Sequence, residues 1–98
     1  MRVSILNLHC LNAIADDYES AGSILEDVRR SSHGNVDAAE ITACLAELMR
    51  DGMADAYRFD AATKQYERNA FTPENVDGIW FRITDLGRRQ LDADWVDD

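Results

Sequence analysis

The side chains best suited to metal binding or nucleophilic chemistry are two histidines and two cysteines, at His9, Cys10, His33 and Cys44. A structural zinc site takes four such ligands in closely spaced pairs, whereas these residues form one adjacent pair and two single positions. Cys10 and Cys44 fall on apolar stripes, where a free cysteine ordinarily behaves as a small buried hydrophobe. We therefore predict no metal and no cofactor, with a redox-sensing or ligand-sensing role for Cys44 as an alternative.

Carboxylates are abundant and stand in adjacent pairs at positions 16–17, 26–27 and 97–98. Acid–base catalysis needs two carboxyl groups in differently perturbed environments within one cleft, and adjacent pairs are usually solvated. The five glycines are isolated from one another, so the chain has no Walker-type or dinucleotide-binding glycine loop. These patterns predict a protein that is not an enzyme and has no catalytic residues.

The composition predicts one small globular domain over residues 1–98, with 46% hydrophobic and 30% charged residues. The formal net charge of −9 should repel nucleic acid and anionic membranes. Two cysteines are too few for a disulfide framework, and the first residues resemble neither a signal peptide nor a membrane span. We expect a cytoplasmic protein.

Helical periodicity dominates the first half of the chain. Apolar residues recur at steps of three and four over residues 3–15, and a second apolar face ends at Arg29–Arg30. A third helix is expected to begin at a capping box formed by Asp37 and Glu40 and to stop at Gly52. Three helices should therefore precede residue 53.

Period-two alternation follows Gly52. Met53, Tyr57 and Phe59 fall on one side of a strand, and residues 65–68 can return beside it as a hairpin. Residues 79–83 predict a further strand whose inward side chains are Ile79, Phe81 and Ile83.

Thr84 is expected to cap a last helix that continues to about Trp95, with Leu86, Leu91 and Trp95 on its inner side. The complete pattern predicts an α+β fold that is mainly helical: three helices, a hairpin within three short strands, and a C-terminal helix.

Two segments resemble MarR-like and PadR-like transcription regulators, which have a winged helix-turn-helix fold. Residues 41–53, with Leu45, Leu48, Gly52 and Met53, are similar to the third helix and strand entry of that family. Residues 81–91, with the sequence FRITDLGRRQL, are similar to its strand-to-helix junction. The resemblance covers most of residues 5–95 and implies a winged helix whose third helix enters a DNA major groove.

The resemblance makes the exposed side of the third helix a recognition face. Removing the apolar stripe leaves seven positions on this face: Ala39, Glu40, Thr42, Ala43, Ala46, Glu47 and Arg50. Over residues 37–51, four carboxylates face one arginine, a net charge of −3. Because duplex binding depends mainly on phosphate neutralisation by lysine and arginine, this face lacks phosphate anchors.

The implied wing carries more positive charge. Arg58, Lys64 and Arg68 outnumber two carboxylates over residues 57–69, a net charge of +1. The pairs Arg29–Arg30 and Arg88–Arg89 would extend this patch if all three clusters met on one face.

Two tryptophans are candidate interface anchors. Alternation places Trp80 opposite its inward neighbours, where it either contacts a partner or packs under the loop at residues 72–78 or against the first helix. Trp95 either closes the core or contributes to a dimer contact.

The sequence thus predicts a non-catalytic winged-helix regulatory protein that acts by protein contacts, self-association or weak DNA binding through the wing. The alternative is a homodimeric, sequence-specific DNA-binding regulator that uses the third helix and Arg50, Arg58, Lys64 and Arg68.

Overall fold

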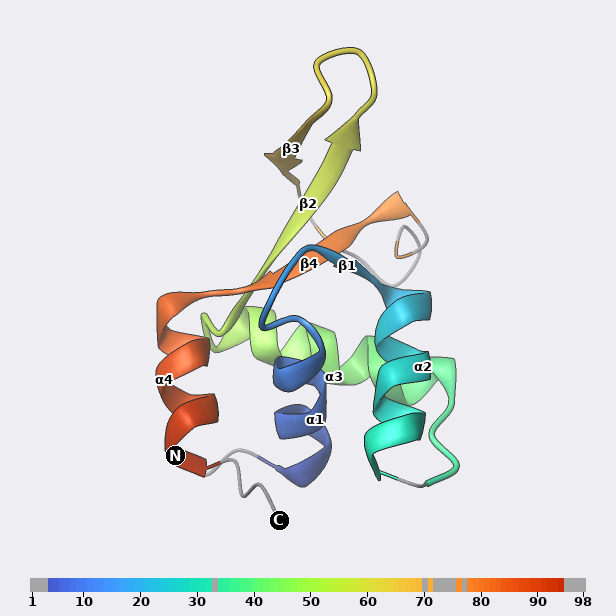
Figure 1. Ribbon diagram of the computed structural model, residues 1–98, viewed down its shortest axis with the longest axis vertical. Helices are drawn as coiled ribbons and strands as arrows, with labels where there is room; N and C mark the ends of the chain where they lie inside the picture. The colour runs from blue at the N-terminus through green and yellow to red at the C-terminus, as the bar shows by residue number, and fades with distance from the viewer. Residues whose placement is uncertain (1–3, 33, 70, 72–75, 77, 95–98) are drawn as a thin grey trace.

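The computed structural model describes residues 4–32, 34–69, 71, 76 and 78–94. Its elements follow the order α1 (Ile5–Ala13), β1 (Glu19–Ser20), α2 (Ala21–Ser32), α3 (Ala38–Arg50), β2 (Ala54–Asp60), β3 (Gln65–Arg68), β4 (Trp80–Ile83) and α4 (Asp85–Asp94). The helices pack below an antiparallel sheet, and the hairpin β2–β3 extends away from them (Figure 1). The α+β prediction is confirmed.

The helix boundaries follow local capping signals. Ser4 caps α1, and its hydroxyl accepts a hydrogen bond from the amide of Asn7 at 3.1 Å. Asp37 caps α3 in the expected capping box, because its carboxylate accepts from the Glu40 amide at 2.8 Å. Gly52 then takes a φ of +75°, a left-handed conformation that favours glycine. The predicted start and stop of this helix are therefore confirmed.

The sheet has the strand order β1-β4-β2-β3. Strand β4 pairs with β2, aligning Phe81 with Ala56 and Trp80 with Tyr57. It also pairs with the two-residue strand β1, where Ser20 faces Trp80. The predicted hairpin and the strand near residue 80 are present, and β1 adds a fourth strand that the sequence pattern does not predict. Two residues are too few for alternation to reveal a strand.

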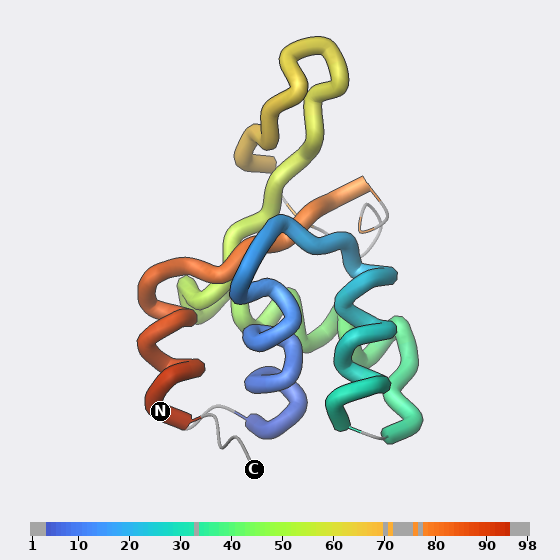
Figure 2. The backbone as a smooth tube through the Cα atoms, in the orientation of Figure 1, coloured from blue at the N-terminus to red at the C-terminus, as the bar shows by residue number. Residues whose placement is uncertain are grey.

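The hairpin makes the molecule long, with principal extents of 42 × 27 × 21 Å. The Cα tube shows it projecting beyond the strands that cover the helices (Figure 2). Its two strands stay in register from Tyr57 opposite Arg68 to Asp60 opposite Gln65. Only the first part of β2 can therefore contribute to the core.

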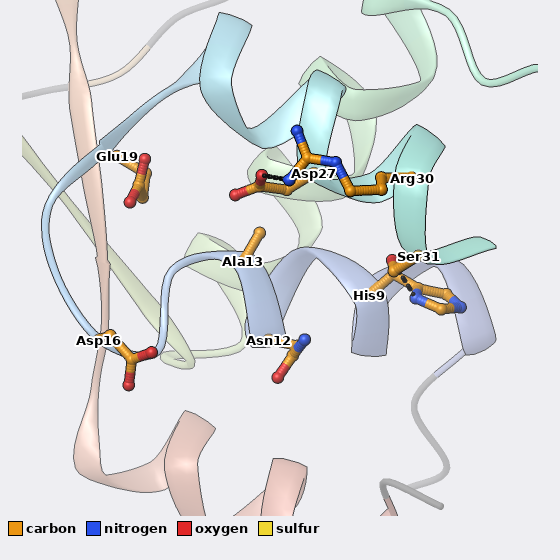
Figure 3. Close-up of a pocket in the computed structure, with 8 residues that line it drawn as sticks. All are labelled: His9, Asn12, Ala13, Asp16, Glu19, Asp27, Arg30 and Ser31. Atoms are coloured by element: carbon orange, nitrogen blue, oxygen red, sulfur yellow. Dashed lines mark hydrogen bonds and ion pairs between the residues drawn. The ribbon is translucent and has the colours of Figure 1, made fainter. Parts of the chain in front are cut away.

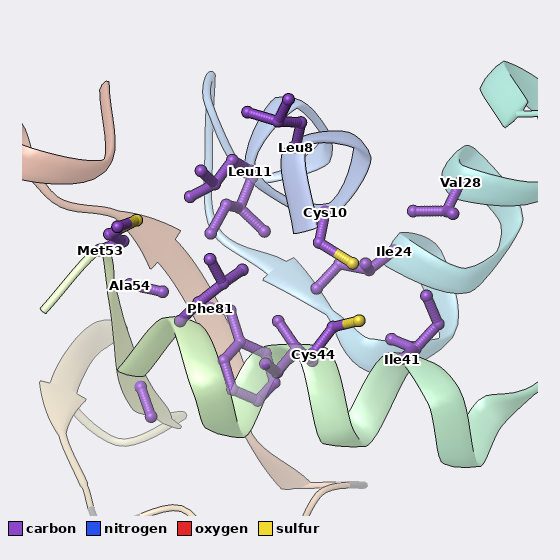
Figure 4. Close-up of a cluster of buried hydrophobic side chains, with 14 of the residues drawn as sticks. Leu8, Cys10, Leu11, Ile24, Val28, Ile41, Cys44, Met53, Ala54 and Phe81 are labelled. Atoms are coloured by element: carbon purple, nitrogen blue, oxygen red, sulfur yellow. The ribbon is translucent and has the colours of Figure 1, made fainter. Parts of the chain in front are cut away.

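One apolar core lies where α1, α2 and α3 meet the sheet (Figure 4). Its largest completely buried side chains include Phe81, Leu11, Ile14, Ile24, Ile41, Leu45 and Leu48. The expected inward residues Ile79 and Phe81 are buried, and Ile83 is partly buried against the core. Burial of this kind is the main favourable term that holds the helices on the sheet.

The side chains of β2 are distributed differently from the expected pattern. Met53, just before the strand, is buried, but so are Ala54 and Ala56, whereas Phe59 is exposed. Tyr57 and Phe59 therefore occupy the side of the sheet that faces away from the core. The turn at Gly52 lets the chain change direction at Met53, so Met53 does not share the alternation of the following strand.

Hydrogen bonds from Thr84 fix the junction between β4 and α4, which lies within residues 81–91. The Thr84 hydroxyl donates to the Gly52 carbonyl at 2.6 Å and accepts from the Gly87 amide at 3.0 Å. Gly87 and Leu91 are buried, whereas Leu86 is 44% exposed. The prediction that Leu86 faces inward is wrong because the backbone at Gly87 makes the close approach to the body. Trp95 lies outside the described residues.

Among the helices of the described residues, none has the length and apolar character needed to cross a membrane.

Candidate functional site

The exposed side of α3 contains all seven expected positions. Six of them are exposed, and Thr42 is partly exposed. The Thr42 hydroxyl donates to the Ala38 carbonyl at 2.9 Å. The seven residues are Ala39, Glu40, Thr42, Ala43, Ala46, Glu47 and Arg50. We call these residues the α3 face. The face consists of small side chains, two carboxylates and one arginine, so its net charge is negative.

Both glutamates of the α3 face are held by hydrogen bonds. The Glu40 carboxylate accepts from the backbone amide of Asp37 at 3.5 Å, which completes the capping box. The Glu47 carboxylate accepts from the side-chain amide of buried Asn7 at 3.0 Å. This second contact joins α1 to α3. The two negative charges are thus part of the local structure of the helix and its neighbour.

The three cations expected in the hairpin do not gather on one surface. Arg58 aligns with Glu67 across the hairpin, and Arg68 aligns with Tyr57. Because side chains alternate along a strand, Arg58 and Arg68 lie on opposite faces. Lys64 lies in the connecting turn with a φ of 57°. Of these three cations, only Arg68 lies on the face that carries Tyr57.

Several other arginines are engaged within the protein. Arg29 donates to the Val36 carbonyl at 2.7 Å, and Arg30 pairs with Asp27 at 3.4 Å. Arg88 donates to the Ala15 carbonyl. The last turn of α2, with Arg29 and Arg30, lies at the opposite end of the molecule from the hairpin (Figure 1). The three basic clusters therefore do not form one continuous band.

Aromatic side chains cover the sheet surface that faces away from the core. Tyr18 and Tyr66 stack with their ring centroids 3.8 Å apart and 6° between planes. Tyr57 contacts Tyr18 edge-on at 5.0 Å, while Trp80 and Phe59 contact Tyr66 at 5.9 Å and 5.1 Å. We call these five residues the outer sheet face. Trp80 is thus half-buried among rings from β2, from β3 and from Tyr18, which directly precedes β1.

Two arginines border the outer sheet face. The guanidinium of Arg82 lies 5.1 Å from the centroid of the Tyr18 ring, a cation–π distance. Arg68 forms an ion pair with Asp55 at 2.7 Å, and its pKa is raised by Tyr57 and by that carboxylate. The surface therefore combines aromatic rings and phenol groups with two guanidinium groups, of which Arg68 pairs with Asp55 and Arg82 lies over Tyr18.

A surface pocket of about 340 Å³ lies between α1 and α2 (Figure 3). In it, the Ser31 hydroxyl and the Nδ1 atom of His9 are 2.8 Å apart. Burial lowers the pKa of His9. On the other side of the pocket, burial and the carboxylates of Asp27 and Asp17 raise the pKa of Glu19.

The Ser31–His9 pair is poorly placed for nucleophilic catalysis. Ser31 lies in the last turn of α2 and also approaches the Val28 carbonyl at 3.4 Å. Carbonyl groups give this helix end a negative partial charge, whereas acyl transfer needs donors that stabilise a developing oxyanion. The pair instead links the end of α2 to α1. Within the described part of the chain, no group of three or more His, Cys, Asp or Glu residues is arranged to hold a metal ion.

Sequence reasoning missed Asn7, Tyr18 and Tyr66 as contributors to these surfaces. Asn7 interrupts an apolar stripe, and this was the available signal that a polar group is held inside the helix packing. Tyr18 and Tyr66 are distant in the chain and meet only because the strand order places their segments together. Their contact has no local sequence signal.

Comparisons with protein-family models, with curated proteins and with solved structures gave no match for this chain.

Proposed function

We propose that this chain is a non-catalytic winged-helix regulatory protein that acts through contacts with a protein partner. The proposal is supported by the order of its elements, in which α1, α2 and α3 precede a projecting hairpin. It is further supported by the resemblance of residues 41–53 and 81–91 to MarR-like and PadR-like transcription regulators. The winged-helix assignment makes α3 the recognition helix and the hairpin the wing.

The observation that carries the functional part of the proposal is the chemistry of the α3 face. In a winged helix that reads DNA, this face must approach a polyanion and anchor to phosphates. Here Glu40 and Glu47 are held by Asp37 and Asn7. Arg50 is the single cation on the face. A groove of duplex DNA would meet fixed negative charge, whereas a basic protein surface would be complementary to it.

The outer sheet face offers a second contact surface in this proposal. Tyrosine and tryptophan are enriched at protein interfaces because they bury a large rigid area at low entropic cost. Phe59 is 41% exposed, and it continues the row of rings that includes Trp80 and Tyr66. These rings would remain available while a partner occupied the α3 face.

A second candidate function is a homodimeric, sequence-specific DNA-binding transcription regulator. Among the residues that the structure describes, Arg50, Arg58 and Lys64 form no ion pair. Arg50 lies on the α3 face and the other two lie in the hairpin, so each is available to a phosphate. Three such contacts would give weak binding with modest salt dependence.

Photo-cross-linking from defined positions separates the two functions. A photoreactive amino acid replaces Ala43 on the α3 face, and in a matched variant it replaces Ala61 at the tip of the hairpin. Both positions are exposed. After irradiation in cells that express the chain, adducts are treated with nuclease or with protease.

The proposal predicts an adduct that forms from position 43, is resistant to nuclease and contains a second protein. A nuclease-sensitive adduct from position 43 would support the DNA-binding candidate instead. Equal adducts from both positions, or none from position 43, would contradict the proposed role of the α3 face.

A further inference from the structure

The two cysteines of the chain meet inside the core. Cys10 comes from α1 and Cys44 from α3, and their sulfur atoms point into the same space between these helices (Figure 4). Both thiols belong to the buried core, each neighbours the other, and neither forms a disulfide. The fold therefore brings together two free thiols that are far apart in the sequence.

The two thiols are not equivalent. Cys10 is 0% exposed, and burial together with the neighbouring Cys44 raises its pKa. Cys44 is 8% exposed, and the neighbouring Cys10 thiol lowers its pKa, whereas burial and the carboxylates of Glu47 and Glu40 act in the opposite direction. The thiolate is the nucleophilic form of cysteine. Cys44 has the better access and is therefore the thiol that an oxidant reaches first.

A metal site is a poor explanation for the pair. Zinc and iron–sulfur sites use four protein ligands, or three in catalytic zinc centres. Among the described residues, no third histidine, cysteine or carboxylate joins the two sulfurs in a suitable group. Two neighbouring free thiols are suited to oxidation to a disulfide.

We propose that Cys10 and Cys44 form a reversible oxidation site that hydroperoxides convert to an intramolecular disulfide between α1 and α3. This inference does not depend on the proposed function, because it rests on two neighbouring thiols in the core and not on the exposed surfaces. It assigns the pair a redox role in addition to its packing role.

The chemistry requires one hydroperoxide for each disulfide. The Cys44 thiolate attacks the peroxide oxygen, the O–O bond breaks, and the leaving hydroxide takes a proton, giving a sulfenic acid and water when the oxidant is hydrogen peroxide. The Cys10 sulfur then attacks the Cys44 sulfur, its proton leaves with the displaced hydroxide as a second water, and the S–S bond forms. Both sulfurs are oxidised and the peroxide is reduced.

The bond would change the mechanical link between the two helices. A disulfide needs the sulfurs about 2.05 Å apart, closer than two sulfur atoms without a covalent bond can lie. The helices must therefore shift slightly towards each other, and Asn7 on α1 and Glu47 on α3 lie one turn from the linked residues. Oxidation should also restrict the unfolded chain by closing the segment from residue 10 to residue 44.

The test uses the purified, fully reduced chain treated with hydrogen peroxide. Intact mass spectrometry is expected to show a loss of about 2 Da, the loss of two hydrogens on disulfide formation. Proteolysis without reduction should yield one peptide pair that joins Cys10 to Cys44. The Tm should rise by several degrees, on the order of 5–15 °C, and return to its initial value with dithiothreitol.

Cys10→Ala and Cys44→Ala provide matched controls, because neither can form the internal bond and neither should show the mass loss. Because a core variant could fail to fold, the decisive measurement is the peptide map of the peroxide-treated wild-type chain. The proposal is overturned if both thiols remain alkylatable after peroxide treatment of the folded chain. Oxidation of Cys44 to a sulfinic acid without a link to Cys10, or a disulfide only between two chains, would also overturn it.

Discussion

Gly87 packs directly against the carbonyl group of Met53: a Cβ atom at position 87 would lie 2.2 Å from the Met53 oxygen and 2.9 Å from the Ile83 side chain. Real carbon atoms do not approach this closely. The glycine therefore allows the first turn of α4 to rest on the chain segment between α3 and β2. It ties the C-terminal helix to the end of the helix that carries the α3 face.

Replacing Gly87 with alanine should destabilise the fold, because the added methyl group overlaps backbone that cannot move independently. We expect Gly87→Ala to lower the free energy of unfolding by about 1–3 kcal/mol. Gly22→Ala is the control, since nothing lies within 4 Å of a Cβ atom there. It should be neutral or stabilise α2 by up to about 1 kcal/mol. Urea denaturation of both variants measures the difference, and equal effects would refute the close-packing account.

Tyr66 is the residue through which the outer sheet face is held together, because its ring contacts Tyr18, Phe59 and Trp80. Tyr66→Ala should reduce the free energy of unfolding by about 1–3 kcal/mol through lost ring contacts and burial. Phe59→Ala removes a ring that contacts Tyr66 alone among the described aromatics, so its loss should be smaller. Denaturation followed by tryptophan fluorescence compares the two. A larger effect at Phe59 would contradict the central position of Tyr66.

The raised pKa of Glu19 predicts a pH-dependent contribution to stability. A carboxyl group that binds its proton more tightly in the folded state gains stability as pH falls through its folded pKa, and its charged form is unfavourable at neutral pH. Glu19→Gln should therefore be more stable than wild type at pH 7, and this advantage should shrink as the pH falls towards 4.5, the ordinary value.

Thermal unfolding of wild type and Glu19→Gln at several pH values measures that difference. Glu26→Gln, an exposed residue on α2, controls for the removal of one negative charge. An advantage of Glu19→Gln that grows at low pH would show that the sign of the Glu19 contribution is wrong.

Local signals were sufficient to predict four helices and both ends of α3. The Asp37–Glu40 capping box and Gly52 act within one turn of the chain, so their effect on α3 is independent of the remaining fold. The exposed positions of α3 follow from helical periodicity for the same reason. Leu86 was misplaced because periodicity does not reveal the close approach of Gly87 to Met53.

The contacts between distant segments could not be predicted in this way. The stacking of Tyr18 on Tyr66 depends on the position of β1 beside β4 and of β3 beside β2. The meeting of Cys10 with Cys44, and of Asn7 with Glu47, depends on how α1 packs against α3. These relationships are set by helix packing and strand register, which no single segment encodes.

Reversing the charge of Glu47 should convert the α3 face into a better surface for nucleic acid. We expect Glu47→Lys to bind duplex DNA several-fold more tightly than wild type at low salt, since it removes a repulsive charge and adds a phosphate contact. Glu26→Lys on α2 changes the total charge equally and should have a smaller effect. Glu47→Gln keeps an acceptor for the Asn7 amide and separates loss of charge from loss of that hydrogen bond. Fluorescence anisotropy measures all three, and identical gains for Glu47→Lys and Glu26→Lys would contradict a specific role for the α3 face.

The most direct test of the central claim is a titration of the wild-type chain with labelled duplex DNA at about 50 and 200 mM salt. A binder that makes six or more phosphate contacts loses roughly a thousandfold or more in affinity across this range. Because the α3 face is negative and the arginines of α2 lie at the opposite end of the molecule from the hairpin, we predict negligible binding at both concentrations. Tight binding at 50 mM salt that weakens steeply at 200 mM would contradict a protein-contact function and establish the DNA-binding alternative.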